Sequence, residues 1–157
     1  MPNVKNKKAL GIDYGLKRIG LSLSDDTQTI AFPLKYILND SVKKTVSELK
    51  TVIEEENVGL LVIGMPIGLK GKKTEISTEI EKFIEVLKES LKEKICGGLI
   101  LTVYDERFSS AQAQRSLIEQ KIKRNKRKEK IDSIASTFIL QSYLDKQKNI
   151  IGKKISE

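Results

Sequence analysis

The chain has 157 residues, a length typical of one domain and too short for two full lobes around a cleft. Lysine and arginine number 29 against 21 acidic residues, and the resulting net charge of +8 favours polyanionic partners. The single cysteine excludes an intramolecular disulfide and a cysteine-rich zinc site, and the absence of histidine leaves hydrolytic chemistry to carboxylates, lysines, hydroxyls or a hard metal ion.

No run of about 18 apolar residues and no signal-peptide pattern occurs, so we expect a soluble, cytosolic protein without a membrane partner.

The first forty residues carry the patterns of short strands. Residues 8–13 (KALGID) predict a buried strand, and the alternating residues 19–25 (IGLSLSD) predict its hairpin partner. A third alternating run, 30–36, contains Pro33, which cannot donate to a ladder and therefore indicates a strand at a sheet edge.

From residue 41 onward, helical and strand patterns alternate. Val42, Val46, Leu49 and Ile53 have the spacing of an amphipathic helix. The apolar runs 58–64 (VGLLVIG) and 97–104 (GGLILTVY) predict fully buried strands. We expect Cys96, directly before the second run, to be a small buried residue. One continuous helix between the two strands is predicted by Ile76, Ile80, Ile84, Leu87, Leu91 and Ile95.

The last third combines two predicted helices with a strongly basic stretch. Ser109 and Gln112 form a capping box that predicts a helix from about residue 110. The segment 121–130 (KIKRNKRKEK) carries seven basic and one acidic side chain and lacks an apolar face, so we expect an exposed, flexible loop. A final helix from residue 131 is predicted by its apolar face, Ile131, Ile134, Ala135, Phe138 and Ile139.

The predicted order of elements is βββαβαβαα. Three antiparallel strands followed by strands that alternate with helices imply a mixed sheet. We therefore expect an α/β, RNase H-like fold, with a mixed five-stranded sheet of three antiparallel and then two parallel strands, flanked by helices. The whole chain, residues 1–157, should form this single domain.

Three acidic positions stand out as candidates for chemistry. Asp13 ends the first buried strand within G-I-D-Y-G, where it is either a ligand for a cation or a turn-capping residue. Glu106 follows the fifth strand in Y-D-E-R-F-S-S, at the sheet edge where parallel strand ends meet, and is interpreted as a ligand. The adjacent Asp105 should point to the opposite face and be structural, with Arg107 as its partner or as a phosphate contact.

Asp132 is the third candidate, expected in the first turn of the last helix. Helical geometry places it on the same strip as Ser136 and away from the apolar face. An aspartate at a helix N-terminus also interacts favourably with the helix dipole, so a purely structural role stays open. The basic stretch is interpreted either as a phosphate clamp or as a solvated loop, and Arg18 in the first hairpin as a contact to phosphate or to a neighbouring carboxylate. The clamp would comprise Lys123, Arg124, Lys126, Arg127 and Lys128.

Taken together, four strings resemble the sequence blocks of the YqgF/RuvX family of Holliday junction resolvase-like nucleases. These strings are ALGIDYGLKRIGLSLSD, LVIGMPIGLKG, VYDERFSSAQA and KIDSIASTFILQSYLD, and they span about residues 8–145. The resemblance implies a divalent-metal nuclease site formed by Asp13, Glu106 and Asp132, and a proposed role in maturing the 5′ end of pre-16S ribosomal RNA. Classical junction resolvases, more distant relatives, use a fourth acidic group, for which Glu129 is a weak candidate.

Hard carboxylate oxygens suit Mg²⁺ or Mn²⁺, so we expect one of these ions as the cofactor. The expected partner is nucleic acid, either precursor rRNA or branched DNA, recognised mainly through its backbone because aromatic residues are few. A junction resolvase would need a homodimer for symmetric cutting, whereas an rRNA nuclease could be a monomer. A non-catalytic nucleic-acid binding module is a further alternative. A sugar-kinase or actin-like phosphotransferase would need two such lobes around ATP, whereas 157 residues supply one.

Overall fold

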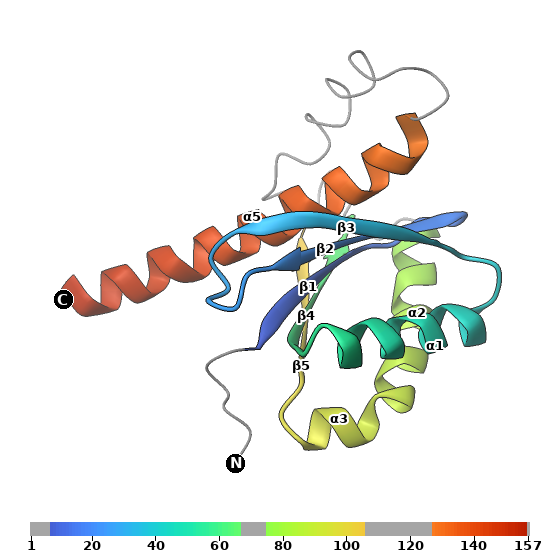
Figure 1. Ribbon diagram of the computed structural model, residues 1–157, viewed down its shortest axis with the longest axis horizontal. Coiled ribbons are helices and arrows are strands. Elements are labelled where there is room, and N and C mark those ends of the chain that lie inside the picture. The colour runs from blue at the N-terminus through green and yellow to red at the C-terminus, as the bar shows by residue number, and fades with distance from the viewer. Residues whose placement is uncertain (1–6, 67–74, 106–126, 157) are drawn as a thin grey trace.

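Five strands form one mixed sheet with helices on both faces (Figure 1). The computed structural model describes residues 7–66, 75–105 and 127–156, and in the last range the side chains of 133–149. The elements are β1 (Lys8–Asp13), β2 (Arg18–Ser24), β3 (Ala31–Leu38), α1 (Val42–Glu55), β4 (Val58–Met65), α2 (Glu75–Ser90), α3 (Lys92–Cys96), β5 (Ile100–Asp105) and α5 (Arg127–Ser156). In these ranges no helix has both the length and the apolar character needed to span a bilayer.

The spatial order of the strands is β3-β2-β1-β4-β5. β2 is antiparallel to both β1 and β3, whereas β4 is parallel to β1 and β5 is parallel to β4. This topology confirms the expected RNase H-like sheet of three antiparallel and two parallel strands. The helix predicted from about residue 110 lies outside the described residues.

Two apolar cores hold the helices against the sheet (Figure 1). The larger core packs α1 and α2 onto one face of the sheet, and its strand members are Leu10, Ile12, Ile19, Leu21, Ile37, Val58, Leu61, Ile63 and Met65. The smaller core packs α5 onto the other face and contains Ala9, Ala31, Leu60, Val62, Tyr104, Ile139, Leu140 and Leu144. Because side chains alternate along a strand, β1 directs Leu10 and Ile12 to α1 and α2 and directs Ala9, Gly11 and Asp13 to α5.

α1 forms as its sequence predicts. Val46, Leu49 and Ile53 are buried, and the side chain of Ser41 accepts a hydrogen bond from Lys44 N at 3.2 Å as an N-cap. Val42, which was expected on the apolar face, is exposed because it is the first residue of α1 and lies outside the buried part of the helix.

The second predicted helix is wrong in one respect, because it is divided in two. α2 ends at Ser90, and Leu91 leaves helical geometry before the single turn of α3, although Leu91 itself stays fully buried. Cys96, expected to be buried, is exposed, since α3 has no buried residue and lies at the rim of the larger core. Gly98, with a φ of 116°, then redirects the chain into β5.

Both edge strands differ from the sequence expectation in their burial. β5 was predicted to be fully buried, but Ile100 and Val103 are exposed because β5 has a partner strand on one side only within the described ranges. β3, with Pro33, is the expected edge strand. Its predicted alternation fails at Phe32, which is 53% exposed, because a register shift opposite Leu21 and Ser22 switches the face that the strand buries.

The last helix begins at Arg127, four residues earlier than predicted, and so includes the end of the basic stretch. Lysine, arginine and glutamate all have high helix propensity, which the missing apolar face had concealed. Asp132 is therefore the sixth residue of α5 and not part of its first turn, where the dipole effect is concentrated. Residues 121–126 lie outside the described part of the chain.

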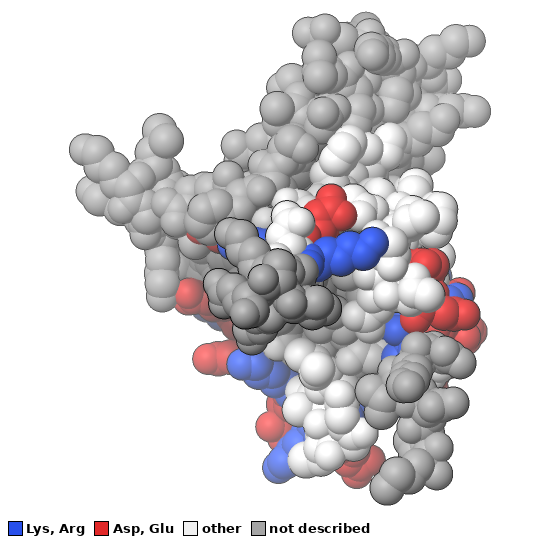
Figure 2. All heavy atoms as spheres, turned by 90° about the vertical axis from the view of Figure 1, so that its left-hand side faces the viewer, with Lys and Arg blue, Asp and Glu red and all other residues white. Residues whose placement is uncertain are grey.

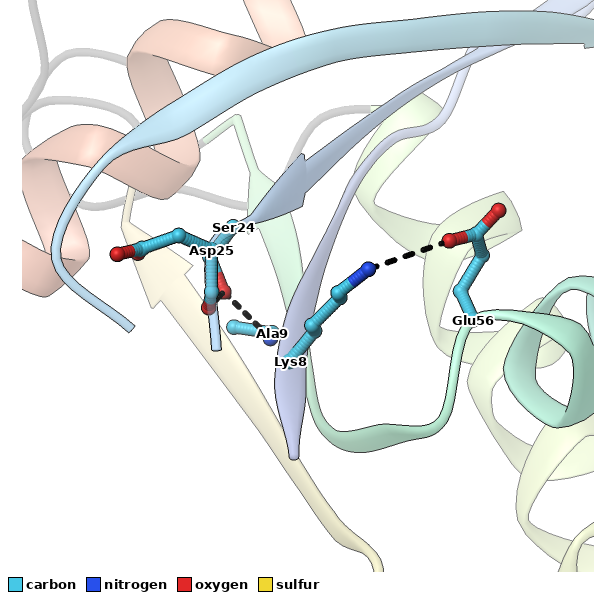
Figure 3. A network of polar contacts seen from close by, with 5 residues as sticks. All are labelled: Lys8, Ala9, Ser24, Asp25 and Glu56. Carbon is cyan, nitrogen blue, oxygen red and sulfur yellow. Dashed lines mark hydrogen bonds and ion pairs between the residues drawn. The ribbon is translucent and has the colours of Figure 1, made fainter. Parts of the chain in front are cut away.

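Polar contacts fasten the start of β1 to its neighbours (Figure 3). Lys8 Nζ lies 3.5 Å from Glu56 Oε2 at the end of α1, and Ala9 N donates to Ser24 Oγ at 2.7 Å. The serine hydroxyl thereby takes the place of a ladder carbonyl where the pairing of β1 with β2 ends at Leu10.

The β2–β3 connection is closed by Asp25. Its carboxylate accepts hydrogen bonds from the Thr27 hydroxyl and from the backbone N–H groups of Thr29 and Ile30, the latter two at 2.8 and 3.0 Å. These bonds, with Thr27 as the largest contribution, lower the pKa of Asp25 from 3.8 to about 2. The ionised carboxylate therefore stabilises this turn.

Asp25 should make the stability of the protein depend on pH in acid. Its contribution is complete above the unfolded pKa of 3.8 and is lost as the pH falls through about 2, because the unfolded chain binds the proton more tightly. Denaturant unfolding of the wild type and Asp25→Asn should thus show a stability advantage of the wild type at pH 5 that shrinks by pH 2. Asp26→Asn, on the same loop, controls for the loss of a charge, and an advantage that stays constant would contradict the assignment.

Candidate active site

Asp13 ends the central strand of the sheet and is the carboxylate around which the candidate site is built. Its side chain is only 5% exposed and lies on the face covered by α5. β1, β4 and β5 run in the same direction, so their last residues, Asp13, Met65 and Asp105, meet at one edge of the sheet. Sites of α/β sheets form at this edge, beyond the carboxyl ends of the strands.

Both strands beside Asp13 carry a glycine at the same level. Gly20 of β2 pairs with Asp13, and the register of β1 with β4, Ile12 opposite Ile63, places Gly64 on the other side. The next residues outward are Tyr36, which pairs with Gly20, and Tyr104, which pairs with Gly64. The positions directly beside Asp13 on both flanking strands therefore carry no side chain.

A tight turn ends β1 directly after Asp13. A Cβ at Gly15 would lie 2.3 Å from Arg18 O, so only glycine fits this turn. Tyr14 packs its ring on Phe83 of α2, with ring centroids 5.0 Å apart, and Asn39 Nδ2 donates to Gly15 O at 2.9 Å. The hairpin that carries Asp13 is thus held from both α2 and the end of β3.

α5 contacts β1 and β2 at a serine pair below the candidate site. Ser22 Oγ donates to Ser136 O at 2.9 Å and lies 2.9 Å from Ser136 Oγ, with both side chains fully buried. Gly11, which pairs with Ser22, makes this approach possible, since a Cβ there would lie 2.2 Å from Ser22 Oγ and 2.9 Å from Leu140 Cβ. The first glycine of G-I-D-Y-G therefore allows α5 to pack closely against the sheet.

The direction of α5 follows from a second contact. Gln141 accepts from Ala31 N at 2.8 Å and donates to Thr29 O at 3.0 Å, near the start of β3 and hence at the edge where β1 begins. Towards its N-terminus, α5 must therefore run to the edge where β1 ends. Position 132 lies one turn before Ser136, a rise of about 6 Å, and Asp13 lies about 6.6 Å along β1 from Gly11. The backbone of α5 thus approaches the end of β1 that carries Asp13.

The other predicted residues are placed as follows. Arg18 is the first residue of β2, and its guanidinium carbon lies 5.4 Å from the centroid of the Tyr36 ring. Asp132 is in α5, and Arg127, Lys128 and Glu129 are in its first turn, but their side chains lie outside the description. Glu106 and the basic residues Arg107, Lys123, Arg124 and Lys126 also lie outside the described residues.

Around Asp13, only part of the expected carboxylate set can be located. Among described residues no group of three potential metal ligands gathers, since Asp13 alone of the three candidates has a described side chain. Asp105 pairs with Met65 at the end of β5. Tyr104, the residue before it, lies on the α5 face, where its hydroxyl is 2.9 Å from Ser142 Oγ. Asp105 therefore occupies the opposite face from Asp13, as predicted.

Sequence reasoning missed the serine pair and the two flanking glycines. Ser22 stands at one of the small or polar positions of the alternating run IGLSLSD, which predict the face turned away from the core, so the run does not indicate its burial. Gly20 and Gly64 carry no signal either, because their position beside Asp13 depends on strand register.

The strand order, the two-sided helix cover and the buried carboxylate at the end of β1 define an RNase H-like nuclease fold. A family model described as "RuvX: Holliday junction resolvase" matches residues 7–146. The chain belongs to this family, as the four sequence blocks indicated.

Curated relatives agree with the family assignment. A protein of Sulfurihydrogenibium sp. (strain YO3AOP1) is 41% identical over 139 residues, which cover 88% of this chain and 90% of the relative. A protein of Thermoanaerobacter pseudethanolicus is 39% identical over 143 residues, which cover 90% and 99%. Both are named "Putative pre-16S rRNA nuclease".

Solved structures confirm the fold. RuvC of T. thermophilus in complex with a Holliday junction substrate superposes with a TM-score of 0.57 at 11% identity and covers 90% of this chain and 96% of that chain. The yeast mitochondrial Holliday junction resolvase gives a TM-score of 0.55 at 12% identity, with coverage of 91% and 80%. At this identity the likeness concerns the fold alone.

The contact between Gly11 and α5 can be tested by a mutant cycle. Gly11→Ala should lower the free energy of unfolding by about 1–3 kcal/mol, the usual cost of overpacking a core. In a Ser22→Ala background, which removes the oxygen 2.2 Å from the new methyl group, the same change should cost less. Gly97→Ala is the control because a Cβ there meets ordinary 3.5 Å contacts. Equal costs in both backgrounds would refute the close approach.

Proposed function

We propose that the protein is a metal-dependent endonuclease of structured nucleic acid that processes the 5′ end of pre-16S rRNA, with the whole chain acting as one nuclease domain. The observation that carries the proposal is the buried carboxylate of Asp13 on the face where α5 approaches it, flanked by glycines on both neighbouring strands. Membership of the RuvX family and the names of relatives that are about 40% identical support the substrate. A role in ribosome maturation would place the protein in the cytoplasm.

The metal ligands in this proposal are Asp13, Glu106 and Asp132. Continued alternation of β5 would put Glu106 on the face of Tyr104, which is also the face of Asp13. Asp132, one turn before Ser136, would reach the same place from α5. A set of carboxylate oxygens fits Mg²⁺ or Mn²⁺, and the enclosure of Asp13 suits an anionic group that is neutralised by a cation. Glu129, three residues before Asp132 in the same helix, is a candidate fourth ligand.

A divalent ion bound there would activate water and stabilise the leaving 3′ oxygen of the cleaved phosphodiester. Asp13, held by the hairpin turn and by the close packing of α5 at Gly11, provides a carboxylate whose position does not depend on the substrate. The ordering of this ligand before binding lowers the entropic cost of assembling the site. Because the chain has no histidine, proton transfer to and from water falls to carboxylates and bulk solvent.

Basic residues would bind the nucleic-acid backbone around this centre. The segment 121–130 holds +6 of the net charge of +8 and leads into α5, which passes the acidic site. On the face of the molecule that carries the β2–β3 connection, away from Asp13, Figure 2 shows acidic and basic side chains interspersed among the described residues. The proposed contacts are Arg18, Arg107, Lys123, Arg124, Lys126, Arg127 and Lys128.

A second candidate function is Holliday junction resolution in DNA. The description of the matching family favours this alternative. It requires two active sites and therefore a homodimer, whereas processing of an RNA end can be done by a monomer. Depletion of the protein in cells, followed by mapping of 16S rRNA 5′ ends, distinguishes the two: accumulated precursor supports the RNA substrate, and normal ends with persistent junctions support DNA.

The metal site predicts a specific phenotype for Asp13→Asn. The variant should lose Mg²⁺- or Mn²⁺-dependent cleavage by at least about a hundredfold, the scale of losing metal-assisted catalysis, yet bind nucleic acid as tightly as the wild type or more tightly, because a negative charge is removed. Cleavage of labelled precursor RNA and fluorescence anisotropy measure the two quantities. Asp26→Asn, an exposed aspartate at the other end of β2, is the matched control and should cleave normally. Full activity of purified Asp13→Asn would exclude this mechanism.

The basic stretch predicts salt-dependent binding. Replacement of Lys126, Arg127 and Lys128 with alanine should weaken binding of different sequences to a similar extent. It should also reduce the slope of log Kd against log salt, by about one unit for each of up to three lost phosphate contacts. A control triple variant with the same change of charge replaces Lys88 of α2 and Lys92 and Lys94 of α3, on the other face of the sheet from α5. A salt slope equal in both triple variants would remove the clamp from the proposal.

A further inference from the structure

On the other side of Asp13 from β4 and β5, the strands β2 and β3 carry a pair of side chains, Arg18 and Tyr36. Arg18 opens β2 and Tyr36 lies in β3, and their side chains form a cation–π contact of 5.4 Å from the guanidinium carbon to the ring centroid. Both side chains are partly exposed. Neither the metal site nor the α5 contact uses this pair.

Strand register puts the pair on the same face as Asp13. Gly20 pairs with Asp13 on one side and with Tyr36 on the other, so these three residues form a row across β1, β2 and β3. Two strand spacings separate the ends of this row, about 10 Å, and only a glycine stands between them. Arg18, two residues before Gly20, is the diagonal cross-strand neighbour of Asp13 on this face, a distance that long side chains span.

The cation–π contact has a direct effect on what the guanidinium can bind. A guanidinium held over an aromatic ring still carries N–H groups that can donate to a phosphate in bidentate geometry. The ring also restricts the rotamers of the long side chain before substrate arrives, which lowers the cost of ordering it on binding. Among described residues no ion pair occupies Arg18.

We propose that Tyr36 is a positioning residue that holds the Arg18 guanidinium over β3, on the face of the sheet that carries Asp13, and that the pair binds a backbone phosphate of the substrate strand next to the one cleaved. The inference rests on the proposed nuclease function and adds to it a binding position on β2 and β3. The ligand is the phosphodiester backbone common to RNA and DNA, so the pair contributes to affinity without reading bases.

The experiment measures binding and cleavage separately. Binding is measured in the Asp13→Asn background by fluorescence anisotropy over a salt series, with a labelled RNA stem that has a single-stranded extension and with a four-way DNA junction. Cleavage by the otherwise wild-type protein gives kcat and KM. Tyr36→Leu should raise Kd and KM roughly twofold to tenfold, the range of a partly exposed cation–π contact, with little change in kcat.

Conservative variants separate positioning from a structural role. Tyr36→Phe keeps the ring and should bind as the wild type does, whereas Arg18→Lys keeps the charge without the planar guanidinium and should resemble Tyr36→Leu. Combining Tyr36→Leu with Arg18→Gln should weaken binding no more than Arg18→Gln alone, because the tyrosine acts through the arginine. Phe32→Leu removes an exposed aromatic side chain from the other face of the same strand and should change neither Kd nor KM.

Two results would overturn the proposal: unchanged binding by Tyr36→Leu, or effects of Tyr36→Leu and Arg18→Gln that simply add. Thermal unfolding of each variant is compared with Phe32→Leu, and if Tyr36→Leu unfolds, the comparison of Tyr36→Phe with Arg18→Lys decides. Failure of the nuclease function looks different, since the wild-type protein would then bind the probes with the predicted coupling but cleave neither with Mn²⁺.

Discussion

The close packing of α5 against β1 and β2 is the constraint on which the rest of the structure depends. At Gly11 the helix backbone comes so near the sheet that a single methyl group would collide with Ser22 and Leu140. Ser22 then donates to the Ser136 carbonyl and fixes where along the helix the contact occurs. Because Asp13 is two residues beyond Gly11 and position 132 is one turn before Ser136, this one contact relates two candidate ligands that are more than a hundred residues apart.

On the same face of the sheet, the positions directly beside Asp13 carry no side chain. Glycines at 20 and 64 flank Asp13, while tyrosines at 36 and 104 occupy the outer strands of the same row. Tyr104 is buried under α5 through its contact with Ser142, whereas Tyr36 carries Arg18 and stays partly exposed. The row therefore ends in a buried tyrosine on β5 and in a partly exposed tyrosine on β3, where we propose that the substrate backbone binds.

Several elements could be predicted because their signals are local. Hydrophobic spacing located α1, a short apolar run located β1, alternation located β2, and Pro33 identified β3 as an edge strand. The wrong predictions concern the burial of single residues and the start of one helix. Cys96 and Val103 are apolar in sequence but exposed, since burial depends on what covers an element and not on its composition. The start of α5 was misplaced because a helix rich in lysine and arginine has no apolar stripe at that end to reveal it.

The sequence by itself determined the class of the fold and the family, because both depend on patterns that are contiguous along the chain, and it marked Asp13 as a candidate ligand. Only the tertiary structure decided which residues surround Asp13. The glycines at 20 and 64, the Ser22–Ser136 contact and the cation–π contact of Arg18 with Tyr36 all depend on strand register and helix docking. Register is a relation between segments, and a shift of one residue would turn every one of these side chains to the opposite face.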